Sequence, residues 1–275
     1  REKGYFDGVN KDFSFANAYA PLDFSARRYC EARVWSYFNM FTARGNEFLP
    51  YILGDTDTPM PLFVKPDRKI SVQDVKNAMR DHYEGTPLDI SKDFGAGPYH
   101  TPYRLSPLSF KVGDKEYFNE RPISTQQSGF VFVAQMRSTL PDAIGGVLWF
   151  GTDDANMTVF TPVYCCTDKV PVCYSRVDGA DYITFSWNSS FWIFNWVSNM
   201  VYPRYDLMIG DVRATQNELE TTFNEAQEGI ESAAAKLLEK DPAKAKAFLT
   251  NYTNMTAQSA FDTWKRLGEF IIVKY

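Results

Sequence analysis

Three strand-like segments followed by two long helical segments constrain the fold of this chain more than any other feature. The segments GFVFVAQMRS, GGVLWFGT and MTVFTPVYC are rich in β-branched and aromatic residues, and the turn DDAN separates the last two. Residues 205–240 and 243–270 then follow a helical pattern, with a break at Asp241 and Pro242. This order predicts an α+β fold that ends in long helices.

The strand segments also indicate how deeply they are buried. Trp149, Phe150, Val159 and Phe160 form near-continuous apolar runs, which are typical of strands covered on both faces. The aromatic stretch at 182–202 fits either a strand or a helix. With 275 residues, 44% of them hydrophobic, the chain is long enough for one large domain or two ordinary ones. It has no internal repeat and no linker, so one domain over residues 1–275 is the simplest prediction.

The charge balance narrows the possible partners. A net charge of −5 gives no reason to expect nucleic acid or an acidic membrane, because both select a basic surface. No run of about 18 apolar residues occurs, so we expect no membrane span. P-loop, dinucleotide-binding and EF-hand motifs are absent from the sequence, and we expect no cofactor.

A helix is predicted near the N-terminus. Asp23 or Ser25 is suited to cap it, and it should extend to about Arg44, before Gly45 and Asn46. Its apolar stripe comprises Cys30, Val34, Tyr37, Phe38 and Phe41. We therefore expect Cys30 to be a buried, inert thiol, since a nucleophilic cysteine needs an accessible cationic niche and a nearby base.

The next segments alternate between loop and helix. Residues 51–69 predict a loop, and Ser71 is suited to cap a helix that extends from Val72 to about Tyr83. The inward-facing residues of this helix should be Val72, Val75 and Met79. Residues 84–107 are irregular and dense in Gly and Pro, and loops of this length are usually functional or act as covers.

The two histidines are the local candidates for acid–base chemistry. His82 lies between Asp81 and Glu84, a cluster that could provide a base with orienting carboxylates. Alternatively, His82 ends a helix and interacts with its negative C-terminal dipole. His100 is expected to be a loop residue stacked on tyrosines, and its wide separation from His82 excludes an HExxH-type zinc site.

The remaining cysteines form a second cluster. Cys165, Cys166 and Cys173 are close enough in sequence for structural thiols or for a disulfide that joins Cys173 to one of the others. A metal site is disfavoured because a fourth ligand and a tight CxxC pair are missing. The sequence therefore leaves the thiol and disulfide interpretations open.

Five blocks of the sequence stand out together: MRDHYEGT, GPYHTPYR, the long block from RPISTQQSGF to TVFTPVY, the closing LGEFIIVKY, and YAPLDFSARRYCEARVW near the start. These blocks resemble the bacterial cysteine-type dipeptidases of peptidase family C69 (U34). The resemblance implies an N-terminal nucleophile hydrolase related to penicillin V acylase and bile salt hydrolase. It further implies a four-layer αββα fold, short peptides as substrates, and a bacterial origin, with an extracytoplasmic location favoured over a cytoplasmic one.

In that family the nucleophile is a cysteine at the mature N-terminus, and its own α-amino group accepts the proton. This chain departs from the pattern, because residue 1 is Arg and no cysteine precedes Cys30. The opening REKGYFDG resembles a segment from the middle of the family's chain. We therefore expect this chain to be the C-terminal portion of a longer dipeptidase. It should be inactive alone, and its partner should be the N-terminal part of the same enzyme. Such a portion would expose apolar sheet faces. An oligomer is also possible.

The resemblance transfers one catalytic residue. The acylase relatives carry S-x-x-R-[FY] at the start of a helix, with the arginine beside the nucleophile, and SARRYCEAR puts Arg28 at that position. Its role would be to lower the pKa of the thiol. Arg33 is the choice if the pattern is offset. A helix-surface arginine paired with Glu31 or Asp23 is the structural alternative.

The substrate-binding residues suggested by the resemblance are His82, Glu84 and His100, on a loop that would form a wall of the site. Two alternative functions stay open at this point. One is a non-catalytic peptide- or glycan-binding module that uses the aromatic surface. The other is an acylase that acts on non-peptide amides.

Overall fold

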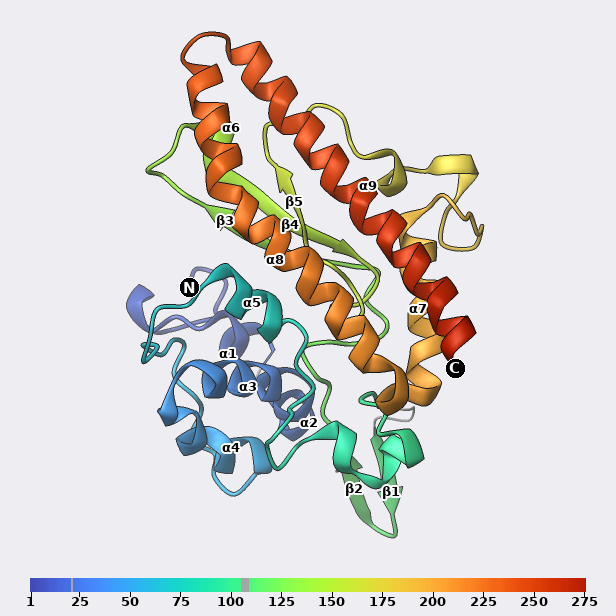
Figure 1. Ribbon diagram of the computed structural model, residues 1–275. Helices are drawn as coiled ribbons and strands as arrows, with labels where there is room; N and C mark the ends of the chain where they lie inside the picture. The colour runs from blue at the N-terminus through green and yellow to red at the C-terminus, as the bar shows by residue number, and fades with distance from the viewer. Residues whose placement is uncertain (21, 105–108) are drawn as a thin grey trace.

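The computed structural model describes residues 1–20, 22–104 and 109–275. Its main sheet is antiparallel in the order β3-β4-β5, beside two long helices (Figure 1). The strands are β3 Phe130–Met136, β4 Gly146–Thr152 and β5 Thr161–Tyr164. The sequence predicted all three, although only the second half of MTVFTPVYC pairs as a strand.

Helices α8 and α9 cover one face of this sheet. Val131, Val133, Val147 and Trp149 alternate along β3 and β4 and are buried in the same core as residues of both helices. The opposite face is open along β3, where Phe130, Phe132 and Met136 have exposed fractions of 61%, 49% and 65%. The neighbouring side chains on the same face of β4, Leu148 and Phe150, are half-buried.

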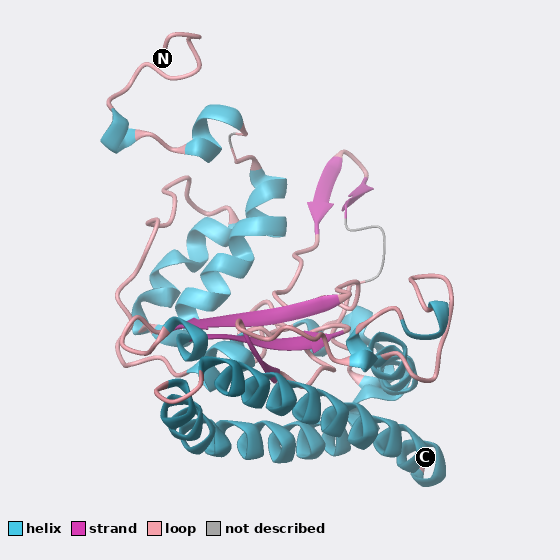
Figure 2. Ribbon diagram, turned by 90° about the horizontal axis from the view of Figure 1, so that it is seen from above, coloured by secondary structure: helices cyan, strands magenta, loops and turns pink. Residues whose placement is uncertain are grey.

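Figure 2 shows α8 and α9 on one side of the sheet, with the N-terminal helices and a small hairpin on the other. The prediction of strands covered on both faces rests on Trp149, Phe150, Val159 and Phe160, of which three are buried and Phe150 is half-buried. Strand β3 was not part of that prediction, and its apolar outer face is exposed.

The C-terminal helices agree with the prediction. They are α8 Tyr205–Leu238 and α9 Pro242–Lys274. The break occurs where expected, because Asp241 caps α9 by accepting hydrogen bonds from the backbone N–H groups of Ala243 and Lys244. For residues 182–202, which fitted either a strand or a helix, the structure has a helix over part of the stretch, α7 Ser190–Val201.

The predicted N-terminal helix contains an interruption. The elements of this region are α1 Phe15–Tyr19, α2 Phe24–Ala26, a π-helical turn Arg27–Glu31, α3 Ala32–Phe41 and α4 Leu49–Leu53. Asp23 caps the run as predicted, since its Oδ1 accepts a hydrogen bond of 2.8 Å from the Ala26 N–H. The run ends at Phe41 rather than near Arg44, because the backbone at Thr42 is extended.

Of the expected apolar stripe of this helix, Phe41 is buried as predicted, but the other four residues are not. Cys30 and Val34 are exposed and Tyr37 and Phe38 are half-buried, whereas the buried side of α3 comprises Ala32, Trp35, Ser36 and Phe41. The buried side was not recognisable as an apolar stripe, because it includes a serine. Ser36 is buried and donates a 2.6 Å hydrogen bond to the carboxylate of Asp81. The expectation that Cys30 is buried is therefore wrong.

The second predicted helix is shorter than expected. Helix α5 Val72–Ala78 begins with a capping box between Ser71 and Asp74, which confirms the predicted start. It ends five residues before Tyr83, whose positive φ of 66° is incompatible with a continuing right-handed helix. The backbone groups of 81 and 82 bond to Ser124 and Ile90 instead. The inward-facing Val72, Val75 and Met79 pack against the main core.

The remaining elements are small. They are β1 Ser109–Val112 and β2 Lys115–Phe118, which form an antiparallel hairpin, and α6 Asp142–Gly145. The prediction of a loop at 51–69 is wrong at its start, because α4 occupies it and buries Tyr51 and Ile52. The long loop at 84–107 contains the short turns Ile90–Lys92 and Phe94–Tyr99, and its residues 105–107 lie outside the described part.

A second, smaller core forms around the N-terminal helices. Its buried residues are Ala32, Trp35, Tyr51, Ile52, Tyr83, Leu88 and Ile90. Trp35 and Tyr83 stack with ring centroids 6.3 Å apart. This cluster fixes the start of α3 against the segment that carries His82 and Glu84.

Candidate active site

Arg28 lies in the π-helical turn between α2 and α3. A π-turn inserts one extra residue into the helix, and such insertions frequently mark functional sites. Here the turn directs the Arg28 side chain away from bulk water, and 13% of it is exposed. The surface-arginine alternative, with Glu31 or Asp23 as partner, does not match the observed contacts.

The partner of Arg28 is Glu120, a residue that the sequence did not single out. The Arg28 Nη2 atom lies 2.5 Å from the Glu120 Oε2 atom, and Arg28 Nη1 also donates to the Ile52 carbonyl at 3.4 Å. The other oxygen of Glu120 accepts from Arg104, which in turn pairs with Asp93. The Glu120 residue is only 2% exposed, so it is a buried carboxylate held between two guanidinium groups.

The segment that carries Glu120 is anchored to the small core. Tyr83 donates a 2.6 Å hydrogen bond from its hydroxyl to the carbonyl of Arg121, the residue after Glu120. Burial first, and then the charge of Glu120, raises the pKa of Tyr83 well above its ordinary value, so the hydroxyl stays a donor. Arg28 and Glu120 are thus both supported by the core that contains Tyr83 and Ile52.

His82 is buried and bonded to Glu84. The Glu84 Oε2 atom accepts from the His82 backbone N–H at 2.6 Å, and its Oε1 atom lies 3.1 Å from His82 Nδ1. The Glu84 side chain is 48% exposed, whereas that of His82 is 1% exposed. His82 lies beyond the end of α5, so it is not the helix-terminal residue of the structural alternative.

Asp81 and Glu84 line a cavity of about 270 Å³, together with Asn77, Arg80 and Arg213. Burial raises the pKa of Asp81 to about 7, an effect that the hydrogen bond from Ser36 opposes. The cavity therefore presents two guanidinium groups and two carboxyl groups, one of which titrates near neutral pH.

His100 lies apart from this cluster. It is exposed, has a positive φ of 54°, and its Nδ1 atom lies 3.0 Å from the carbonyl oxygen of Ser91. Within the described residues, no hydrogen bond joins His100 to His82 or Glu84, and none joins Arg28 to any of the three. The structure thus brings His82 and Glu84 together and leaves Arg28 and His100 separate.

A second acidic site was missed because DDAN has the composition of a turn. Asp153 and Asp154 are both 1% exposed, and they line a cavity of about 230 Å³ with Tyr202 and other polar residues. Asp154 accepts a 2.9 Å hydrogen bond from the Tyr202 hydroxyl, and Asp153 accepts hydrogen bonds from Ser198 and Asn195. Burial raises the pKa of Asp153 to about 6 and that of Asp154 to about 7.

The cysteines are free thiols, and among the described residues no hydrogen bond joins any of them to Arg28. Cys30 is exposed and lines a largely apolar groove of about 540 Å³ with Val34, Tyr37, Phe38 and other residues. Cys165 is exposed, Cys166 is half-buried and Cys173 is buried, without a disulfide among them. Burial raises the pKa of Cys173 to about 11, which makes it a poor nucleophile.

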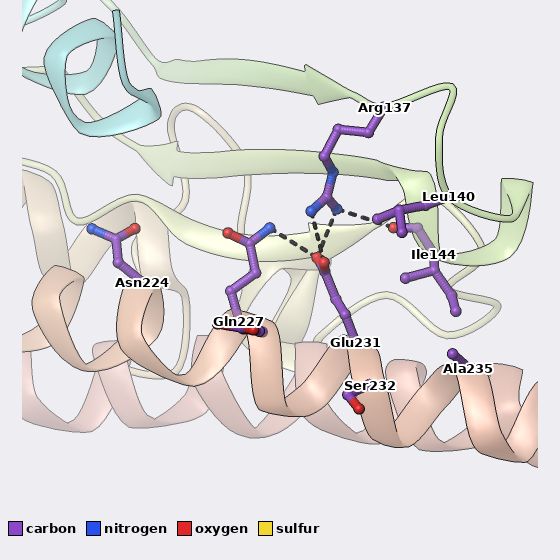
Figure 3. A pocket seen from close by; sticks show the side chains of 9 residues that line it. Arg137, Leu140, Ile144, Asn224, Gln227, Glu231, Ser232 and Ala235 are labelled. Carbon is purple, nitrogen blue, oxygen red and sulfur yellow. Dashed lines mark hydrogen bonds and ion pairs between the residues drawn. The ribbon is translucent and has the colours of Figure 1, made fainter.

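Another cavity, of about 460 Å³, lies between α8 and the segment from Arg137 to Ile144 (Figure 3). Arg137 and Glu231 face each other there in a bidentate pair, with N–O distances of 2.6 and 2.7 Å. Arg137 also donates to the Ile144 carbonyl. Because the charges of Arg137 and Glu231 are paired with each other, this pair connects the end of β3 to α8.

Across residues 1–20, 22–104 and 109–275, no group of three or more His, Cys, Asp or Glu side chains is arranged to hold a metal ion. In the same part of the chain, no helix combines the length and the apolar character needed to cross a membrane.

The chain is similar to several proteins that are named as dipeptidases. A probable dipeptidase of Salmonella dublin is 30% identical to it over 164 residues. A probable dipeptidase B of Lactococcus lactis subsp. lactis (strain IL1403) is 24% identical over 277 residues, and dipeptidase A of Lactobacillus helveticus is 26% identical over 137 residues. These alignments cover 60%, 98% and 50% of this chain. They cover 32%, 50% and 24% of the relatives, so the chain spans half or less of their length.

The family model for peptidase family C69 matches residues 1–218, which is most of the chain. The chain belongs to peptidase family C69. This confirms the resemblance seen in the sequence blocks and the link to bacterial dipeptidases.

Proposed function

We propose that this chain is the C-terminal portion of a cysteine-type dipeptidase, a single domain over residues 1–275 that contributes Arg28 to the active site. The observation that carries the proposal is the position of Arg28 in a π-helical turn, with a largely buried guanidinium group held by Glu120. Arg28 also occupies the arginine position of the motif that the acylase relatives carry. The match to peptidase family C69 and to relatives named dipeptidases supports the substrate class.

In the proposed reaction, a cysteine thiol from the upstream part of the enzyme attacks the carbonyl carbon of a short peptide, and the α-amino group of that cysteine accepts the thiol proton. Arg28 stays protonated and cannot act as a base. Its positive charge stabilises the thiolate, and therefore lowers the thiol pKa, and it also favours the negative charge that develops on the carbonyl oxygen.

Glu84 and His100 supply the proposed wall of the substrate site, because their side chains are exposed. His82 is buried and acts on the substrate through Glu84, whose carboxylate it orients with two hydrogen bonds. The neighbouring cavity with Arg213 and Asp81 contains groups of both charges. Such a cavity suits a peptide that has a free ammonium and a free carboxylate group.

The open face of the main sheet supports a four-layer fold in the whole enzyme. Phe130, Phe132 and Met136 are apolar and exposed, and an exposed apolar sheet face of this kind normally packs against another layer. In the proposal, the upstream part of the enzyme provides a second sheet, which would lie about 10 Å from this one. Chain 1–275 alone lacks the nucleophile and is inactive.

The direct test compares the whole enzyme with chain 1–275 on a set of dipeptides. We expect turnover by the whole enzyme, which iodoacetamide abolishes, and none by the chain alone. Turnover by the chain alone that survives iodoacetamide would refute the nucleophile-upstream mechanism. Penicillin V and conjugated bile acids in the same assay separate a dipeptidase from an acylase.

The role of Arg28 is tested in the whole enzyme with Arg28→Ala. We expect kcat/KM to fall by roughly 100-fold or more, the magnitude typical of losing one charge-stabilising group. Arg44→Ala is the matched control, because Arg44 lies near the same helix but is exposed and forms an ion pair with the exposed Glu47. Full activity of Arg28→Ala would remove Arg28 from the mechanism.

A further inference from the structure

Glu120 is unusual because it is a buried carboxylate shared by two arginines from distant segments. Its Oε2 atom lies 2.5 Å from Arg28 Nη2, and its Oε1 atom accepts from Arg104 Nη2. The exposed side-chain fractions are 3% for Glu120, 13% for Arg28 and 14% for Arg104. Each carboxylate oxygen thus has its own guanidinium partner, which fixes the orientation of both arginines.

The charge balance of this trio differs from that of a simple ion pair. If Arg28 and Glu120 were alone, the carboxylate would cancel most of the field of the guanidinium group at a neighbouring thiol. The second guanidinium leaves the buried trio with one net positive charge. Asp93, the other partner of Arg104, is 36% exposed, so water screens its charge more effectively than that of Glu120.

The backbone around Glu120 restricts its movement. Glu120 follows β2 by two residues, and the Tyr83 hydroxyl holds the next peptide group through the Arg121 carbonyl. Tyr83 is itself fully buried and stacks on Trp35 of α3, the helix that continues from the π-turn of Arg28. The carboxylate and the arginine that it binds are therefore attached to one rigid cluster.

We infer that Glu120 and Arg104 are positioning residues for Arg28: Glu120 fixes the guanidinium group, and Arg104 offsets the charge of Glu120 so that Arg28 acts on the nucleophile as a cation. This inference rests on the proposed function, because it assumes the catalytic role of Arg28. It assigns a role to a carboxylate and an arginine that the sequence reading did not identify.

The first test uses Arg104→Gln in the whole enzyme. Losing this charge should raise the nucleophile's thiol pKa by about one unit while Arg28 stays in place. The readout is the pH dependence of iodoacetamide inactivation, together with the pH profile of kcat/KM. We expect both midpoints to move to higher pH, with the plateau at alkaline pH preserved. An unshifted midpoint with a lower plateau would indicate a merely structural role for Arg104 and would overturn the inference.

The second test uses Glu120→Gln and Glu120→Asp. An amide cannot accept from both arginines with charge assistance, so Glu120→Gln should lower kcat about tenfold or more at every pH, with KM little changed. Glu120→Asp retains the charge and should restore part of the loss. Equal activity of Glu120→Gln and wild type would also overturn the inference. If Glu120→Gln fails to fold, as a thermal melt would show, Arg104→Gln alone decides.

Two controls separate this inference from the proposed function. Glu116→Gln and Lys111→Gln change exposed charges in the same hairpin and should leave the midpoints and kcat unchanged. Activity of the wild type and its loss in Arg28→Ala test the proposed function. When those two results hold, normal kinetics in the Glu120 and Arg104 variants refute only the positioning roles.

Discussion

The side-chain nitrogen of Lys76 lies 3.4 Å from the centroid of the Trp149 ring, in a place where both residues are fully buried. The same nitrogen donates a 2.9 Å hydrogen bond to Asn224 Oδ1. Lys76 thus connects α5 to β4 and to α8. These two contacts attach the N-terminal part of the chain to the main core. Burial lowers the pKa of Lys76 to about 7, more than the nearby Glu220 raises it.

The Lys76 pKa predicts how stability depends on pH. Between about pH 7 and 10.5, the unfolded lysine holds a proton that the folded one has lost, so the free energy of unfolding rises with pH. Lys76→Met should lack this rise. Urea unfolding at pH 6.5 and 9.5 measures it, with the exposed Lys240→Met as control. Equal pH slopes for wild type and Lys76→Met would contradict the prediction.

The contribution of Asp154 to the free energy of unfolding should fall, rather than rise, with increasing pH. Burial, and then the charge of Asp153, raises its pKa from 3.8 to about 7, so the folded carboxyl keeps a proton that the unfolded one releases. This contribution to stability is present at low pH and is lost as the pH rises toward 7. Relative to Asp154→Asn, the wild type should therefore lose stability between about pH 4 and 7. Asp7→Asn, an exposed control, should keep the wild-type slope in the same unfolding experiments.

The pair of Arg80 and Glu220 should be important for stability. It has an N–O distance of 2.5 Å and is buried, and Arg80 also donates to the carbonyls of Ala155 and Thr158. Glu220→Gln leaves a buried guanidinium group without its counter-charge, which should cost about 3–5 kcal/mol of unfolding free energy. Glu47→Gln, which removes the exposed partner of Arg44, should cost less than about 1 kcal/mol. Similar losses in urea titrations of the two variants would refute this distinction.

The thiols should differ in their reactivity. Native protein treated with iodoacetamide at pH 8 should be alkylated at Cys30 and Cys165, which are exposed, and protected at Cys173, which is 3% exposed. Peptide mapping by mass spectrometry identifies the modified residues, and denatured protein is the control for Cys173. Rapid alkylation of native Cys173 would contradict its burial.

Cys30→Ser should change the free energy of unfolding by no more than about 0.5 kcal/mol, as is usual for surface substitutions. A loss of several kcal/mol would instead support the buried position that the helical stripe predicted. Thermal melts of both proteins provide the measurement.

The sequence predicted those elements whose determinants are local. The strand propensity of 130–136, the cap at Ser71 and the break at Asp241 each depend on a few neighbouring residues, and each is present in the structure. The N-terminal helix was only partly predictable. A regular period of 3.6 residues cannot anticipate a π-turn, and a buried serine whose partner lies 45 residues away looks polar in a local pattern.

The candidate site was predictable to a similar extent. Arg28 was proposed through the arginine motif of the acylase relatives, and His82 with Glu84 through their short spacing. Glu120 gave no local signal, because its partner Arg28 lies 92 residues earlier and its neighbours have the composition of a surface loop. The buried pair Asp153 and Asp154 was hidden for the same reason, since only the packing of α7 and its flanks shows that the turn is enclosed.

The order of the sheet and its covering helices has a consequence for biosynthesis. Strands β3 to β5 leave the ribosome before α8 and α9, so Val131 and Trp149 lack the cover of these two helices until roughly 100 more residues have been made. At about 5–20 residues per second, this interval lasts about 5–20 s. During it the apolar side chains that α8 and α9 later bury are exposed, which favours aggregation of this part of the chain.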